Sequence, residues 1–470
     1  MEFGPFTCIA GANGVGKSNL FDAIFFLSAL SEKTFLDAAL SVRDQGKRSG
    51  DVRGLFRHVG DQFAETIRIE AEMIIAREAT DDLAQLAVAT STFVRYGVEL
   101  RYRGPWHPQG SIELLREELE HIPKGSAKRL LNFPFSGDWF ENVISNERRT
   151  PRFISVEPSK EGNMIQLHQD GGSRGKPLKY PAATLPRTVL STAKAAESPT
   201  LTVVRRELQS WRQLQLEPSA LREPDEFMAP PVLGNNGAHL AAVIARLAEE
   251  QRDERGDVRV ILAQRLSDLL DGATEVRIDR DEKRQLLTVN LISRDGTPHP
   301  ARSLSDGTLR FLALSVLSLD HDKGGLLCLE EPENGIHPSR IPAMISLLED
   351  LATDPETWEP ESGESPLRQV IVNSHSPEFV ERVHEDSLLY ATSKNVTVDG
   401  TRFQALDLRA MGGTWRKIPA HISMGDLLGQ LGKSRPERVE PERPPGSMKR
   451  RRIMEIEDVK QAVLDSGSNG

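Results

Sequence analysis

The chain has 470 residues, is 38% hydrophobic and carries 59 basic against 69 acidic residues, a net charge of −10. This length allows two or three domains or one head with a large insertion, and the acidic balance argues against a surface that coats nucleic acid uniformly, although a local basic patch is still allowed. No apolar run reaches the roughly 18 residues of a membrane span, and Cys8 and Cys328 have neither disulfide nor metal spacing, so we expect a soluble cytoplasmic protein with reduced core cysteines.

The first predicted elements are a strand, a loop and a helix around a glycine-rich segment. Residues 6–10 are mostly apolar, residues 9–20 read IAGANGVGKSNL, and apolar side chains at helical spacing follow to residue 30. The pattern G-x-x-x-x-G-K-[ST] in this context predicts a phosphate-binding loop whose backbone N–H groups face an anion; a chance glycine-rich turn is the alternative. The residues expected around the nucleotide are Asn13, Gly14, Gly16, Lys17, Ser18 and Asn19.

Two side chains of this loop have individual expected roles. Lys17 is predicted to reach the β- and γ-phosphates and so to take part in catalysis, and Ser18 is predicted to ligate Mg²⁺. The expected cofactors are therefore ATP and Mg²⁺.

The middle of the chain contains strands and a stretch with weak periodicity. Alternating apolar and polar residues at 66–75 and 92–102 predict an antiparallel sheet with one solvent-exposed face. The periodic spacing of apolar residues weakens between residues 104 and 230. Here we predict paired strands at 153–157 and 164–168 and helices at 111–121 and 201–216. Next come predicted helices at 236–250 and 257–270, too short for an extended coiled coil, and predicted strands at 274–279 and 285–293.

Several segments with candidate functional residues follow one another from residue 303 onward. The segment SLSDGTLR at 303–310 opens an apolar helix at 311–319. Alone, Ser305, Asp306 and Gly307 in this segment predict only an N-cap for the following helix.

The segment LLCLEEPENGIHP at 326–338 begins as a buried strand and carries Glu330 and Glu331 to its C-terminal end, where ligands bind in open α/β sheets. Glu330 is the predicted second Mg²⁺ ligand and Glu331 the predicted general base. The alternative is an acidic helix N-terminus that favours the dipole.

A helix at 341–351, a hydrophilic loop at 353–366 and another buried strand follow, and this strand ends at His375 within NSHSPEF. His375 is a candidate to hydrogen-bond the γ-phosphate or the attacking water; a turn residue is the alternative. A last strand pair is predicted at 388–408.

These motifs, in this order, resemble those of ATPase heads of the ABC superfamily, in the branch with SMC, RecF and the OLD-like predicted ATPases. GANGVGKSN is similar to Walker A, SLSDGTLR to the signature, LLCLEEPENGIHP to Walker B with the D-loop, and NSHSPEF to the switch-histidine loop. The resemblance implies an α/β P-loop NTPase fold with a mixed central sheet, a small antiparallel sheet and a compact α+β or helical insertion. Gln62 is the Q-loop candidate. Glu330 departs from the commoner Asp, and Asp306 and Thr308 depart from the transporter signature.

The expected division places the ATPase head at 1–103 and 273–431, the insertion at 104–272 and a tail at 432–470. The resemblance implies that two copies dimerise head to tail around ATP, so that the Ser305 loop of one copy caps the γ-phosphate bound to Gly16 and Lys17 of the other. Ser305, Asp306 and Gly307 are the nucleotide contacts that it implies in this loop. A basic run at 449–452 is a candidate phosphate contact or simply part of a solvated tail.

The favoured function is an ATP-hydrolysing head that regulates or drives a nucleic-acid-directed process, in antiphage defence with a separate effector such as a nuclease or toxin. DNA is a further candidate partner. A RecF- or SMC-like repair or maintenance ATPase is the alternative, a nucleotide-sensing scaffold stays open, and the signature and long insertion disfavour a transport subunit. The effector is expected on another polypeptide because the sequence has no Toprim carboxylate set and no G-x-S-x-G nucleophile motif.

Overall fold

The computed structural model describes residues 1–42, 52–60, 62–108, 110–146, 152–160, 162–170, 176–250, 257–267, 272–320, 325–360, 366–398, 400–418 and 420–433. The chain divides into a unit of Met1–Leu431 and a unit of Gly432–Gly470. The predicted basic run at 449–452 lies outside the described residues.

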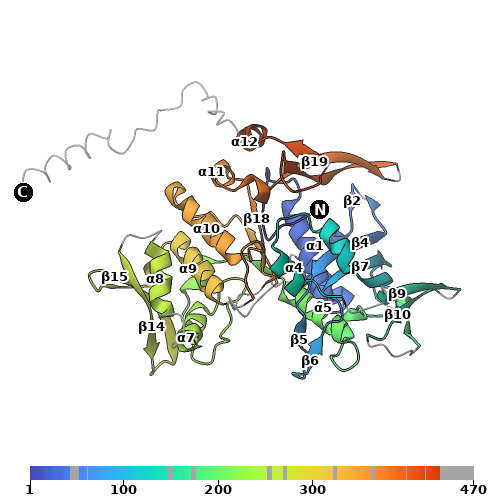
Figure 1. The fold of residues 1–470 in the computed structure, drawn as a ribbon, viewed down its shortest axis with the longest axis horizontal. Helices are drawn as coiled ribbons and strands as arrows, with labels where there is room; N and C mark the ends of the chain where they lie inside the picture. Colours follow the sequence, from blue (N-terminus) through green and yellow to red (C-terminus); the bar gives the residue numbers. More distant parts are fainter. Residues whose placement is uncertain are drawn as a thin grey trace, which may run out of the picture. The chain divides into compact units, whose positions relative to one another are not determined.

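In the described residues of the first unit, the central sheet has seven strands, and the first five in spatial order are parallel. Figure 1 labels two of them, β18 and β19. Strand β20 runs antiparallel to β19 and pairs in parallel with β21. Every residue of β1 is buried, as expected for an apolar strand covered on both faces. In spatial order the strands are β12 (Arg212–Leu214), β17 (Leu326–Glu330), β18 (Gln369–Ser374), β1 (Phe6–Ala10), β19 (Leu388–Val398), β20 (Thr401–Met411) and β21 (His421–Ile422).

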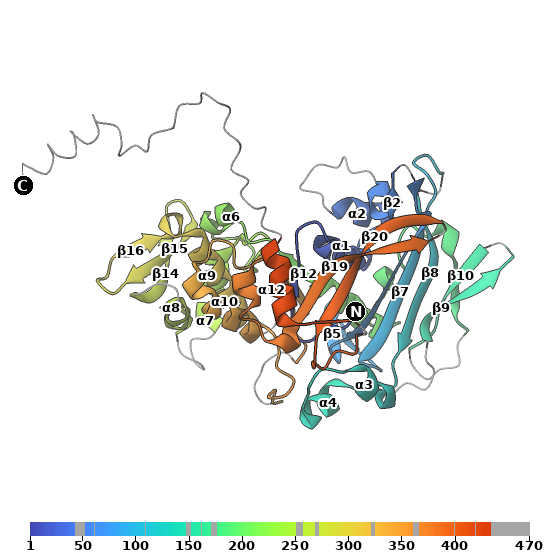
Figure 2. The ribbon, with the colours of Figure 1, turned by 90° about the horizontal axis from the view of Figure 1, so that it is seen from above.

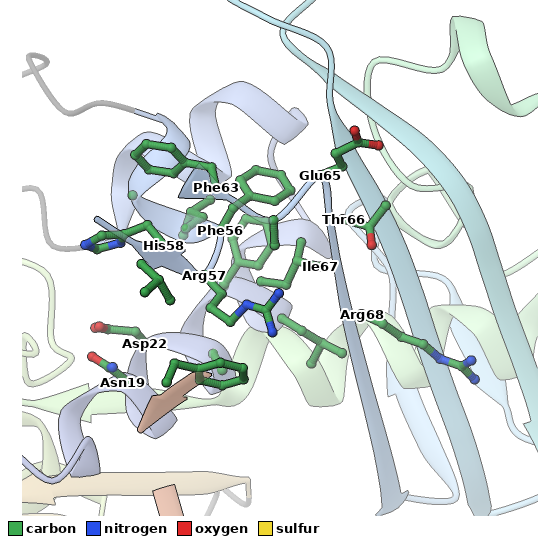
Figure 3. A pocket seen from close by; sticks show the side chains of 18 of the residues that line it. Asn19, Asp22, Phe56, Arg57, His58, Phe63, Glu65, Thr66, Ile67 and Arg68 are labelled. Atoms are coloured by element: carbon green, nitrogen blue, oxygen red, sulfur yellow. The ribbon is translucent and has the colours of Figure 1, made fainter. Parts of the chain in front are cut away.

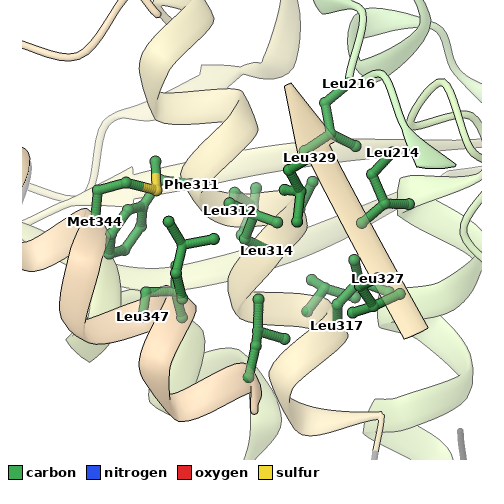
Figure 4. Packing of buried hydrophobic residues seen from close by; sticks show 14 of the residues in the cluster. Leu214, Leu216, Phe311, Leu312, Leu314, Leu317, Leu327, Leu329, Met344 and Leu347 are labelled. Atoms are coloured by element: carbon green, nitrogen blue, oxygen red, sulfur yellow. The ribbon is translucent and has the colours of Figure 1, made fainter. Parts of the chain in front are cut away.

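Helix α9 (Asp306–Leu319) is the most deeply buried helix near this sheet. From Gly307 to Leu319 every residue except Arg310 is buried, which is the pattern of a helix enclosed on all sides. Figure 4 shows its leucines packed between β17 and helix α10 (Ile341–Leu351). This packing fixes the N-terminus of α9, where the candidate residues 305–307 lie.

Further helices have the following bounds: α1 (Lys17–Leu30), α2 (Phe35–Ser41), α5 (Pro199–Ser210), α6 (Pro218–Arg222), α11 (Pro377–Val380) and α12 (Met424–Lys433). The helix predicted at 201–216 ends at Ser210, and that prediction is wrong beyond this point because residues 212–214 form edge strand β12 beside β17. Figure 2 shows the long β19–β20 hairpin that extends from the sheet.

A second sheet has six antiparallel strands in the order β11-β10-β9-β8-β7-β4. The predicted strand pairings at 66–75 with 92–102 and at 153–157 with 164–168 are confirmed. Their bounds are β4 (Thr66–Ile74), β7 (Phe93–Tyr102), β8 (Ile112–His121), β9 (Arg152–Ser159), β10 (Gly162–Leu167) and β11 (Leu178–Pro181).

The predicted helix at 111–121 is wrong, because this segment is strand β8. Its buried positions alternate, but the register shifts between Arg116 and Leu114 opposite β7, so that the alternation changes phase after Leu114. Leucine and glutamate favour helices, and the phase change hides the period of two; pairing with β7 and β9 overrides the local preference.

A third sheet, β13-β15-β14 with β16 beside β15, packs against helices α7 and α8 (Figure 1). The strands and helices predicted between 236 and 293 are confirmed with shifted ends, except that residues 268–270 of the helix predicted at 257–270 lie outside the described residues. The remaining elements are β2 (His58–Val59), β3 (Gln62–Phe63), β5 (Glu78–Thr80), β6 (Leu86–Val88), α3 (Lys124–Leu130), α4 (Gly137–Val143), β13 (Asp225–Glu226), α7 (Leu240–Glu250), α8 (Val258–Ser267), β14 (Ala273–Asp281), β15 (Leu286–Ser293) and β16 (Pro298–Pro300).

The architecture is the expected mixed α/β fold with a mostly parallel central sheet. The division at 103 and 272 remains a prediction, and the boundary after residue 103 falls in the hairpin that joins β7 to β8 within one sheet. Cys8 and Cys328 are buried free thiols, as expected. Within the described part of the chain, no helix combines the length and the apolar character that crossing a membrane requires.

Candidate phosphate-binding and hydrolytic site

The glycine-rich loop joins the end of β1 to the start of α1. Gly16 is the N-cap of α1 with φ 102°, and Gly14 has φ 81°. Both values lie in the left-handed region that favours glycine. The first turn of α1 contains no acidic residue, so the positive end of the helix dipole is available to an anion. Sequence and local geometry therefore agree on a phosphate-binding loop.

The Lys17 side chain lies inside this loop. It is 7% exposed, and its Nζ donates to the carbonyl oxygens of Gly11 at 2.6 Å and Ala12 at 2.8 Å. Burial lowers the pKa of Lys17, and the nearby carboxylates of Glu331 and Glu330 act in the opposite direction. The ammonium is thus placed next to both the loop backbone and the acidic pair.

Strands β17 and β18 end at the same edge of the sheet as β1. Ala10 pairs with Ser374, Glu330 pairs with Asn373, and the Gly11 N–H donates to the Ser374 carbonyl at 3.2 Å. Because parallel strands bring their carboxyl ends together, the phosphate loop, the acidic pair and His375 emerge side by side. Glu330 is exposed at this edge.

Glu331 and His375 are in direct contact. His375 Nδ1 lies 2.7 Å from Glu331 Oε1, and Asn334 Nδ2 donates to Glu331 Oε2 at 2.7 Å. Since an ionised carboxylate only accepts hydrogen bonds, Nδ1 is the donor. We expected each residue here, but not their contact. Glu331 has φ 47°, which is strained for a residue with a side chain, and its N–H donates to the Asn373 carbonyl at 3.0 Å.

Sequence reasoning missed Glu333, the third carboxylate of the segment EEPEN. Its side chain is 7% exposed, and Oε1 accepts a hydrogen bond from the Ser374 hydroxyl. Among the described residues, Oε2 has no hydrogen-bond partner. Burial raises the pKa of Glu333, Glu331 acts in the same direction, and the bond from Ser374 opposes them. The available signal was a carboxylate on a loop that follows a buried strand.

The segment around Ser305 caps α9 and packs on the same loop as Glu331. Ser305 Oγ accepts from the Thr308 N–H at 3.2 Å, and Asp306 forms an ion pair with Arg222 at 2.6 Å. A Cβ on Gly307 would lie 2.4 Å from the Gly335 carbonyl oxygen. Arg310 donates to the Asn334 carbonyl. The signature-like segment is therefore coupled to the loop of Glu331 within one chain.

A cavity of about 1590 Å³ adjoins the first turns of α1 (Figure 3). Asn19 and Asp22 line it from α1, Phe403 from β20 and Gln62 from β3, and the Arg57 guanidinium lies 4.4 Å from the Phe403 ring centroid. Gln62, the Q-loop candidate, is exposed here. Sequence reasoning did not predict this cavity, because its walls come from segments far apart in the chain.

A glycine-rich loop between a buried parallel strand and a helix, with two carboxylates at the end of another parallel strand of the same sheet, is typical of P-loop ATPases. Residues 6–167 and 181–381 match the family model described as "AAA domain, putative AbiEii toxin, Type IV TA system". The chain belongs to this family, and an ATP-hydrolysing activity follows from that membership. The predicted fold class and the predicted P-loop ATPase membership are confirmed.

Comparison with curated proteins gave no match. Among solved structures, the chain is similar to an Smc head bound to the C-winged helix domain of ScpA (12% identity, TM-score 0.36, 86% of this chain and 92% of that chain). It is also similar to an Smc head from Pyrococcus furiosus bound to the C-terminal domain of ScpA (9% identity, TM-score 0.36, 92% of this chain and 94% of that chain). A third similar structure is the SMC head domain from Thermotoga maritima (14% identity, TM-score 0.30, 87% of this chain and 91% of that chain).

Proposed function

We propose that the chain hydrolyses Mg²⁺-bound ATP at the shared edge of β1, β17 and β18. The observation that carries the proposal is the 2.7 Å contact between Glu331 and His375 beside the phosphate loop. In the proposed site, Gly14, Gly16 and Asn13 surround the phosphates and Lys17 neutralises their charge. Lys17 exchanges its two loop carbonyl oxygens for phosphate oxygens when ATP binds.

Ser18 and Glu330 are the proposed ligands of Mg²⁺. A hydroxyl and a carboxylate oxygen are the hard donors that this ion prefers, and Mg²⁺ usually keeps several waters alongside one or two protein ligands. The donor set therefore fits the metal. When bound, Mg²⁺ would supply charge neutralisation at the β- and γ-phosphates.

Glu331 is the proposed general base. It accepts a proton from the water that attacks the γ-phosphorus, the new P–O bond forms as the bond to the β-phosphate oxygen breaks, and ADP leaves with the electron pair. His375 and Asn334 each occupy one oxygen of Glu331, which leaves a further lone pair on each oxygen for water. These two contacts hold the carboxylate in a single orientation.

The adenosine is proposed to extend toward the cavity beside α1. Asn19 follows the phosphate loop directly and lines this cavity together with aromatic and amide side chains of other elements. Such side chains stack on a base or bond its edge. The proposal is supported by the position of the cavity next to the loop.

Ser305, Asp306 and Gly307 are proposed to complete the nucleotide site of a second copy in an ATP-dependent head-to-tail dimer. Their support is the exposed position of Ser305 and Asp306 at the N-terminus of a rigid helix, where Arg222 pairs with the charge of Asp306. This capping would link ATP binding to assembly.

The biological role that we propose is antiphage defence together with a separate effector; a RecF- or SMC-like repair role is the second candidate. The family description, which names a putative AbiEii toxin and a toxin–antitoxin system, supports a role that involves a toxin. DNA and the effector remain proposed partners. Steady-state ATP hydrolysis by the purified chain, with and without DNA, tests the enzymatic proposal; turnover at the level of a Lys17→Ala variant would contradict it.

A further inference from the structure

Glu333 links two loops of the proposed hydrolytic site. The Ser374 hydroxyl donates to Glu333 Oε1, and Ser374 Oγ in turn accepts from the Ser376 N–H at 3.1 Å. The Ser374 carbonyl accepts from Gly11 of the phosphate loop at 3.2 Å. One buried side chain therefore connects the loop of Glu331 to the residues on both sides of His375.

A buried carboxylate with a single hydroxyl partner is a poor choice for packing alone. Placing an ionisable group in the interior costs free energy unless its oxygens are bonded, and an apolar side chain of similar size would avoid that cost. Oε2 of Glu333 has no hydrogen-bond partner among the described residues. The position of Glu333 is thus better explained by what its bonded oxygen holds in place.

A single hydrogen bond lets two segments rotate about it, so two connections are needed to fix the loop of Glu331 relative to the end of β18. The Glu331 N–H already bonds the Asn373 carbonyl at 3.0 Å, and the bond from Ser374 to Glu333 is a second connection one residue further along β18. His375 follows Ser374 directly, so the second bond limits how far the imidazole can move from Glu331.

We propose that Glu333 is a positioning residue for ATP hydrolysis, which holds His375 against Glu331 through the Ser374 hydroxyl. Glu333 touches neither the nucleotide nor the attacking water. This inference rests on the proposed roles of Glu331 and His375.

The test compares Glu333→Ala, Glu333→Gln and Ser374→Ala in steady-state ATP hydrolysis and ATP binding. Glu333→Ala and Ser374→Ala each lower kcat by about 10- to 100-fold, because a misplacement of about 1 Å has an effect of that order. KM and Kd for ATP change less than about twofold in both variants. Glu333→Gln keeps an oxygen acceptor for Ser374 and restores kcat to within about threefold of the parental value.

The double variant Glu333→Ala with Ser374→Ala distinguishes a positioning role from general damage to the fold. If Glu333 acts through Ser374, the combined variant loses no more activity than Glu333→Ala alone, since the two residues share one interaction. Glu117→Gln is the matched control: Glu117 is also a fully buried carboxylate, but it lies in β8 of the second sheet and accepts from the Val189 and Leu190 N–H groups. We expect its kcat to stay within about twofold of the parental value.

Three results would overturn the inference: parental kcat in Glu333→Ala, additive losses in the double variant, or no rescue by Glu333→Gln. If Glu333→Ala does not fold, Ser374→Ala decides by the same criteria. A Glu331→Gln variant in the same assays distinguishes a failure of the proposed general base from a failure of the positioning role. Parental turnover in Glu331→Gln contradicts the proposed base itself, whereas slow Glu331→Gln with unaffected Glu333→Ala and Ser374→Ala contradicts only the positioning role.

Discussion

At the scale of single residues, the site depends on which oxygen or nitrogen each side chain presents. His375 and Asn334 each contact one oxygen of Glu331, and Lys17 Nζ donates to two loop carbonyl oxygens. In the proposed site the two residues serve different steps, because Lys17 would bind the phosphates and Glu331 would bind the attacking water.

Replacing Lys17 by alanine removes the cation that neutralises the β- and γ-phosphates. We expect Lys17→Ala to abolish ATP binding, measured by titration with a fluorescent ATP analogue in the presence of Mg²⁺. The protein should stay folded, because the bonds that Nζ makes within the described residues go to two carbonyl groups of its own loop. Undiminished affinity would contradict the assignment.

Replacing Glu331 by glutamine keeps the size and shape of the side chain and removes the proposed general base. We expect Glu331→Gln to bind ATP with parental affinity and to hydrolyse it about 10² or more times more slowly, because a positioned base contributes that order. Single-turnover assays with radiolabelled ATP measure the chemical step. Turnover at the parental rate would place the base elsewhere.

At the scale of elements, the sequence predicted the strands and helices that carry the phosphate loop, the acidic pair and His375. These elements have long apolar runs or clear end signals, such as glycine before α1 and serine before α9. The sequence did not predict β8, whose register shift breaks the alternation, nor the role of Glu333, whose partner Ser374 is 41 residues away. Local patterns record propensity and period, whereas such pairings depend on the tertiary fold.

The close approach of Gly307 to Gly335 joins α9 to the loop of Glu331. A Cβ at position 307 would also lie 2.8 Å from Ile336 Cδ1, so Gly307→Ala must separate the two backbones. We expect a loss of about 1–3 kcal/mol in unfolding free energy and a lower kcat, measured by denaturant titration and ATPase assay. Gly125→Ala in α3, where a Cβ meets nothing within 4 Å, is the control and should leave both quantities nearly unchanged; equal behaviour of the two variants would contradict this account.

Strand β8 buries a titratable group. Burial raises the pKa of Glu117 to about 7, above the value near 4.3 of an exposed glutamate. The folded state therefore binds the proton more tightly, so the stabilisation from protonated Glu117 is complete below about pH 4 and is lost as pH rises through about 7. We expect the free energy of unfolding to fall between pH 5 and 7 with a slope that Glu117→Gln reduces, measured by urea titration at several pH values. An unchanged slope in the variant would assign the pH dependence to other groups.

At the scale of the whole molecule, the proposed site is incomplete in one copy. The Ser305 segment contacts Gly335 and Asn334 of its own chain, while its exposed end is proposed to face the phosphates of a second copy. Glu331→Gln should therefore assemble into dimers with ATP and Mg²⁺ in light scattering coupled to chromatography, and Ser305→Arg in this background should prevent it. The control Ser267→Arg, at an exposed position of α8, should still dimerise. A stable oligomer that responds to neither nucleotide nor Ser305→Arg would contradict the capping role.

In the proposed role, a second polypeptide acts on the target of this ATPase. The described residues bring one set of proposed catalytic side chains together at the edge of the central sheet, and the sequence shows neither a Toprim carboxylate set nor a G-x-S-x-G nucleophile motif. The proposed ATP-dependent dimer would hold or release the partner polypeptide that carries out the chemistry on nucleic acid. We expect the purified chain to hydrolyse ATP while plasmid, linear DNA and RNA stay intact in Mg²⁺ or Mn²⁺, and cleavage or toxicity to appear only when a genetically adjacent protein is added. Cleavage that persists through purification and disappears on substitution of an acidic residue other than Glu330 and Glu331 would contradict this, because such a residue would reveal a second catalytic centre within the chain itself.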